Sequence, residues 1–105
     1  MIKIQVIYHN SEFRELKIQG HAKAADKGQD IVCAAVSAVS EGGVQALTDD
    51  EKSYEFEMKE GYLDLKRIAP NMSEHDKTVM MTIVTQLESI ALVSKNHVQL
   101  ERKQQ

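Results

Sequence analysis

The sequence predicts a single α+β domain over residues 1–105, with strands and helices in the order ββαββαβ. Three observations support this. The chain has 105 residues, 42% hydrophobic and 28% charged, enough for one core and typical of an ordinary globular protein. Segments of period-two alternation indicate strands, and two longer segments are helical. Strands and helices do not alternate singly, which favours a mostly antiparallel sheet with two packed helices.

The first two strands form the predicted N-terminal hairpin. At 2–8 every even position carries an apolar side chain, and the polar run 9–12 is typical of a turn. A second strand at 13–19 alternates apolar and charged side chains. Phe13 breaks that alternation, so we expect a β-bulge near the start of this strand.

The first helix follows a loop. Residues 22–29 have no apolar periodicity and are predicted to form a mobile loop of small residues. Asp30 is a suitable N-cap, and the helix is expected to continue through Leu47, with Gly42-Gly43 either bending it or permitting close packing. Its residues are apolar or small on nearly every side, which predicts burial on more than one face. Part of that cover is expected from a second copy of the chain, in a homodimer.

The second half repeats the ββα order and adds a strand. Alternation at 53–58 and 62–68, around Glu60-Gly61, predicts a hairpin. Ser73 begins a capping-box sequence and a helix of about 20 residues, for which Asn96 is the expected C-cap. Val98 and Leu100 then predict a short final strand, and residues 101–105 are expected to fray.

Charge and cysteine content exclude several functional classes. With 13 basic and 16 acidic residues the net charge is −3, which argues against direct nucleic-acid binding. A single cysteine excludes an internal disulfide and a zinc site of several thiolates, and four scattered histidines lack metal-ligand spacing, so we expect no metal or cofactor. No apolar run is long enough for a bilayer, and no signal peptide is expected. We therefore expect a cytoplasmic protein with no membrane contact.

The lone cysteine is the strongest candidate for chemistry. Cys33 follows the predicted N-cap Asp30 by three residues, so it lies in the first helical turn, where unpaired N–H groups create positive potential. That potential stabilises a thiolate, and a nearby histidine completes the requirement for a cysteine nucleophile. His21 lies at the mouth of the loop leading into the helix. Ser37 lies one turn after Cys33 on the same helical face.

Structural roles for these residues remain open on composition alone. A cysteine in an Ala/Val-rich helix is most often a small buried hydrophobe, and a loop histidine is most often a surface residue. Asp30 is expected to cap the helix in any case, and Ser37 could donate to a carbonyl one turn earlier.

A family resemblance appears at these residues. The runs Gly20-His21-Ala22 and Asp30-Ile31-Val32-Cys33-Ala34-Ala35-Val36-Ser37 resemble the ribosomal-processing cysteine protease family (Prp, also called YsxB-like), and length and element order match over nearly the whole chain. The resemblance implies a cysteine endopeptidase that removes a short N-terminal extension from a large-subunit ribosomal protein precursor. It implies Cys33 as nucleophile, His21 as general base, Asp30 and Ser37 as supporting polar residues, and Gly20 as the residue that frees the backbone beside the base. It also implies a homodimer whose loop at 22–29 orders on substrate binding.

In the expected mechanism, the start of this helix carries the nucleophile and also supplies hydrogen-bond donors. His21 removes the proton of Cys33, and backbone N–H groups of the first turn bind the developing oxyanion. The substrate is expected to be extended, apolar at the cut and held at a strand edge, although the sequence does not say which edge. Two other functions stay open: a non-catalytic dimeric module that binds a ribosomal or assembly protein, and a single-cysteine redox protein.

Overall fold

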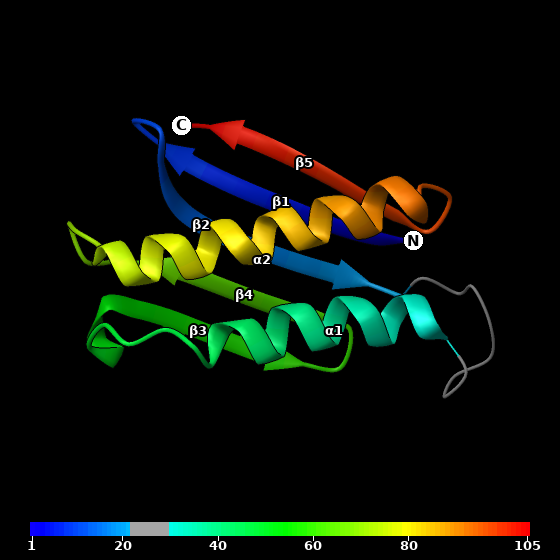
Figure 1. Cartoon of the computed structure of the whole chain (residues 1–105), viewed down its shortest axis with the longest axis horizontal. Coiled ribbons are helices and arrows are strands. Elements are labelled where there is room, and N and C mark those ends of the chain that lie inside the picture. Colours follow the sequence, from blue (N-terminus) through cyan, green and yellow to red (C-terminus); the bar gives the residue numbers. More distant parts are fainter. Residues whose placement is uncertain (22–29) are drawn as a thin grey trace.

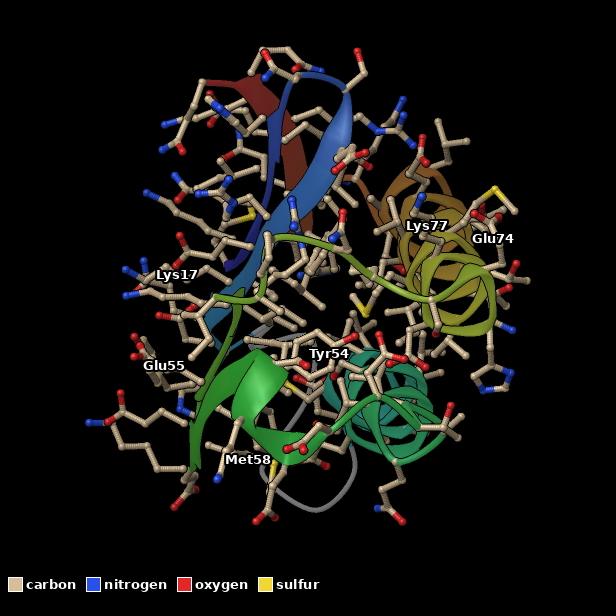
Figure 2. All side chains as sticks on the ribbon, turned by 90° about the vertical axis from the view of Figure 1, so that its left-hand side faces the viewer. Lys17, Tyr54, Glu55, Met58, Glu74 and Lys77 are labelled. Carbon is tan, nitrogen blue, oxygen red and sulfur yellow. The ribbon has the colours of Figure 1, made fainter. Side chains whose placement is uncertain are left out.

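The computed structural model describes residues 1–21 and 30–105 and confirms the predicted order of elements. The strands are β1 (Ile2–His9), β2 (Glu12–Gly20), β3 (Tyr54–Lys59), β4 (Tyr62–Arg67) and β5 (Val98–Gln104), and the helices are α1 (Ile31–Val44) and α2 (Glu74–Val93). One sheet in the order β3-β4-β2-β1-β5 is antiparallel except for the parallel pair β1 and β5. Both helices cover the same face of this sheet (Figures 1 and 2). No helix in the described part of the chain is both long and apolar enough to span a membrane.

The core lies between the sheet and the two helices. Alternation along the central strands turns one set of apolar side chains toward α2 and leaves charged residues such as Lys17 on the open face (Figure 2). The largest apolar side chains that are completely buried are Ile4, Val6, Leu16, Leu65, Met80, Ile83, Leu87 and Val98. The prediction of a half-buried sheet with apolar residues on one face is confirmed.

The β1–β2 hairpin contains the expected bulge. Tyr8 pairs with Phe13 and Ile7 pairs with Glu15, so Arg14 is the extra residue on β2. Asn10 and Ser11 form the two-residue turn with φ of 51° and 65°. Positive φ at both positions is the conformation of the turn that matches the right-handed twist of its strands.

Helix α1 is shorter than the sequence predicts. It ends at Val44, because the amides of Ala46 and Leu47 donate to carbonyls only three residues earlier and tighten the chain into a turn. Within one chain only Val36 and Ser40 of the helix are buried, so burial of a further face, which would need the expected second copy, stays a prediction. The helix covers the β3 side of the sheet, where nothing in the described residues packs over its outer surface.

Close packing, rather than a bend, explains Gly43. A Cβ atom at this position would lie 2.5 Å from Cγ1 of Ile83 on α2, well inside van der Waals contact. The glycine therefore lets the two helices approach each other over the sheet.

The C-terminal region also differs from the prediction. Helix α2 has Ser94 as its C-cap, whose amide donates to the carbonyl of Ile90, so the expected cap at Asn96 is wrong. Strand β5 continues to Gln104, where it pairs with Tyr8, instead of fraying from residue 101. The polar residues 101–104 carry no alternation that predicts a strand. They form one because β1 is long enough to pair with them.

A buried carboxylate joins the start of α2 to the segment before β3. Ser73 caps α2 by accepting from the Asp76 amide at 3.1 Å, as predicted. The Asp76 carboxylate, 0% exposed, accepts from the amides of Thr48 and Asp49 at 2.8 and 3.0 Å and from the Tyr54 hydroxyl at 2.7 Å. Burial alone would raise the pKa of Asp76, but these hydrogen bonds outweigh it and hold the pKa below its usual range. Burial, then the bond to Asp76, raises the pKa of Tyr54.

Candidate active site

One cleft contains all five residues that the sequence singles out. It has a volume of about 800 Å³ and lies between the first turns of α1, the end of β2 and the β3–β4 hairpin. Its lining includes Gly20, His21, Asp30, Cys33 and Ser37. The sequence places these residues on separate elements, and the fold brings them to a single end of the sheet. The predicted loop over the site, 22–29, lies outside the described residues.

Cys33 is a half-buried thiol in the first turn of α1. It faces the cleft on one side and packs against the apolar core on the other. Asp30 is the N-cap, as predicted, and one of its oxygens, Oδ1, accepts from the amides of Val32 and Cys33 at 3.0 and 3.1 Å. The Asp30 carbonyl accepts from the amide of Ala34 at 3.1 Å. The cap therefore fixes the backbone that carries the thiol.

The same cap overturns one expectation about the mechanism. The amides of Val32 and Cys33 are not unpaired, since both donate to Asp30. An oxyanion at this helix terminus would have to compete with a carboxylate for those two donors. Asp30 therefore orders the first turn, and its carboxylate also competes with an oxyanion for the positive potential at the helix start.

His21 is held in place by two other segments. Its carbonyl accepts from the Met1 ammonium group, and the preceding Gly20 donates to the carbonyl of Gly61 at 3.0 Å. Gly20 has a φ of +105°, and a Cβ there would lie 2.3 Å from the Met1 carbonyl oxygen. No other residue fits at Gly20 without displacing the chain beside the histidine.

Gly61 is a site residue that the sequence does not reveal. It has a φ of +70°, and a Cβ added to it would lie 2.7 Å from Nε2 of His21. The imidazole therefore lies directly against the turn between β3 and β4. In the sequence Gly61 is only a turn signal, because the contact joins residues that are distant along the chain.

Replacing Gly61 with alanine is expected to reduce catalytic efficiency by about 10-fold to 100-fold, because the added Cβ would displace His21, the expected general base, from its alignment. The left-handed backbone should also destabilise the variant by about 1 kcal/mol. Cleavage kinetics and urea unfolding measure the two effects. Gly42→Ala is the matched control: a Cβ there meets nothing within 4 Å, so activity should stay normal and stability should rise by up to about 1 kcal/mol. Unchanged kinetics in Gly61→Ala would contradict this role.

Ser37 has a less defined role than the other predicted site residues. Ser37 is exposed one turn after Cys33. The hydroxyl bond to a carbonyl one turn earlier, considered above for Ser37, is made instead by Ser40, which donates to Val36 at 2.7 Å. Within residues 1–21 and 30–105, no three His, Cys, Asp or Glu side chains gather closely enough to hold a metal ion.

Known proteins are similar to this chain in both sequence and fold. The family model described as cysteine protease Prp matches residues 1–99. The ribosomal processing cysteine protease Prp of Mycoplasma genitalium is 35% identical over 98 residues, which cover 93% of this chain and 92% of that protein.

Two crystal structures of the Staphylococcus aureus protease Prp have the same fold. One, in complex with a covalently linked product peptide, has a TM-score of 0.89 at 24% identity and covers 98% of this chain and 100% of that chain. The other, with a substrate peptide, has a TM-score of 0.83 at 23% identity with the same coverage. Because the family model spans nearly the whole chain and a relative above 30% identity aligns along its length, this chain belongs to the cysteine protease Prp family.

Proposed function

We propose that this cysteine protease removes a short N-terminal extension from the precursor of a large-subunit ribosomal protein, with Cys33 as nucleophile and His21 as general base. The observation that supports the proposal is the single cleft that both residues line, beside the capped start of α1. The relatives named ribosomal processing protease, and the peptide complexes of the Staphylococcus aureus protein, support the choice of substrate. A processing enzyme of this kind would act in the cytoplasm.

The chemistry follows from the two side chains. His21 accepts the proton of the Cys33 thiol, and Sγ attacks the carbonyl carbon of the scissile peptide bond. The C–N bond then breaks, and the imidazolium returns its proton to the leaving amine. Water, deprotonated by His21, attacks the thioester, so that the new carboxylate leaves and the thiol is restored. Asp30 supports these steps by holding the turn that carries Cys33.

The test is incubation with candidate ribosomal protein precursors, followed by mass measurement of both product termini. One cut near the precursor's N-terminus is expected. Since Cys33 is the only cysteine, pretreatment with iodoacetamide adds one label and should abolish the cut. A precursor that stays intact while Cys33 is accessible to the reagent would overturn the proposal.

We also infer that the enzyme is a homodimer. The most exposed large apolar side chains are Ile31, Leu92 and Val93, at 79%, 79% and 87% exposure. They lie at the start of α1 and the end of α2, which are at the same end of the molecule (Figure 1). Cover from a second copy would remove this surface from water. Analytical ultracentrifugation tests the inference, and a monomer at micromolar concentration would contradict it.

A further inference from the structure

We propose that the outer edge of β3 binds the substrate as an added strand, with Phe56 and Met58 contacting alternate apolar side chains of the peptide. This inference rests on the proposed function and extends it, because it names the edge that holds the peptide and the pattern that the edge selects.

The topology leaves two edges, and only one reaches the cleft. The sheet order places β3 at one edge and β5 at the other (Figure 1). Met58 and Lys59, at the end of β3, line the same cleft as His21 and Cys33, whereas no residue of β5 does. A peptide lying along β3 therefore runs into the cleft that holds the thiol.

The backbone of β3 can accept a partner. The amide of Ile68 donates to the carbonyl of Ser53 at 2.8 Å, which shows that the N–H and C=O groups of Ser53 and every second residue after it face β4. The groups of Phe56 and Met58 consequently point away from the sheet. Within the described residues no strand pairs with this edge, and such an edge is a ready template for an extended peptide.

The side chains of these two residues add an apolar contact. Phe56 and Met58 pair with the buried Leu65 and Leu63, so they lie on the helix-covered face of the sheet. They are nevertheless 48% and 49% exposed, so α1 does not cover them fully. Met58 also lines the cleft, and Figure 2 shows it between β3 and α1. Side chains on the same face of an added strand would cover both residues.

The opposite face of β3 carries carboxylates. Glu55 and Glu57 are exposed there, and Figure 2 shows Glu55 directed away from the helices. Residues on the two faces of an added strand alternate, and opposite charges directly across strands are favourable. The preferred peptide is therefore extended, and its apolar side chains alternate with polar ones. Among the polar side chains, basic ones are favoured beside Glu55 and Glu57.

Backbone pairing is tested with the Cys33→Ala variant and synthetic peptides spanning the cut found in the wild-type assay. Two peptides are N-methylated at alternate positions of opposite parity. One parity should bind about 10-fold or more weakly, and the other should bind like the parent peptide. Hydrogen exchange should show protection of the Phe56 and Met58 amides on binding, while the amide of Leu100 on the other edge is unchanged.

The apolar contact is tested by cleavage kinetics. Met58→Asp should raise KM by about 10-fold or more and change kcat less, because it removes binding rather than chemistry. Met81→Asp is the matched control, a methionine on α2 that is 63% exposed and outside this cleft. Its kinetics should equal those of the wild type.

The outcomes separate the two proposals. If the wild type cuts no precursor, the proposed function itself fails. If the wild type cuts but both N-methylated peptides bind alike, the amides stay unprotected, or Met58→Asp behaves like Met81→Asp, only the β3 edge is wrong. The Phe56 and Met58 amides could also become protected without peptide as the protein concentration rises. That result would assign this edge to a second copy of the chain and overturn the inference.

Discussion

The Cys33→Ala variant is expected to cleave precursor at least on the order of 10⁴-fold more slowly than the wild type, because removal of a covalent nucleophile leaves only binding and positioning. Sγ is the atom that forms the acyl-enzyme in the proposed mechanism, and no other residue in the chain can supply a thiol. Single-turnover cleavage followed by mass spectrometry measures the rate. The residual activity should not depend on pretreatment with iodoacetamide.

The fold of this variant should be preserved. Cys33 is only half-buried, so loss of one sulfur atom should change the free energy of unfolding by about 1 kcal/mol or less. Urea unfolding, and sedimentation of the wild type and variant side by side, establish that the loss of activity is not a loss of structure. A folded Cys33→Ala variant that cuts at the wild-type rate would eliminate Cys33 as the nucleophile.

The Asp76→Asn variant is expected to lose about 1–3 kcal/mol of unfolding free energy, the cost of leaving buried hydrogen-bond donors without an acceptor. The wild-type carboxylate accepts from the amides of Thr48 and Asp49 and from the hydroxyls of Thr48 and Tyr54. An asparagine amide has one accepting oxygen and an NH₂ group that would face these donors. Urea unfolding at neutral pH measures the difference, and a loss below about 1 kcal/mol would contradict the network's importance.

The same network predicts how stability depends on pH. The folded pKa of Asp76 is lowered, so its ionised form stabilises the fold above the unfolded pKa of about 3.9. That contribution is lost as the pH falls through the folded pKa. The gap between wild type and Asp76→Asn should therefore narrow below about pH 4. Glu74→Gln is the control: its carboxylate is in the same helical turn but 91% exposed, so its stability should follow the wild type.

The sequence predicts those parts of the fold that depend on local pattern. Period-two alternation identifies strands whose one face is buried, such as the segment containing Leu16 and Ile18, and capping chemistry identifies Asp30 and Ser73. It fails where a distant segment decides the structure. Residues 101–104 form a strand only because β1 is beside them, and the first helix ends at Val44 although no glycine or proline lies between that residue and Leu47.

The candidate site is predictable in its chemistry but less so in its surroundings. His21 and Cys33 stand out because a thiol in a first helical turn and a nearby histidine have a specific chemical use. Gly61 and Met58 have no such signature, since a turn glycine and a strand methionine are common. They join the site because the β3–β4 hairpin folds against the end of β2, which is a contact between distant parts of the sequence.

The parallel pairing of β1 with β5 sets the order in which the enzyme can assemble. Ile2 pairs with Val98, and the Ile2 amide donates to the carbonyl of His97, so the earliest and latest strands are neighbours. Such non-local contacts slow folding, because a long loop must close before they form. During synthesis, β1 keeps a bare edge until residues 98–104 have been made. A chain translated only as far as α2 therefore has no complete sheet, and the cleft residues fold before the edge of β1 is covered.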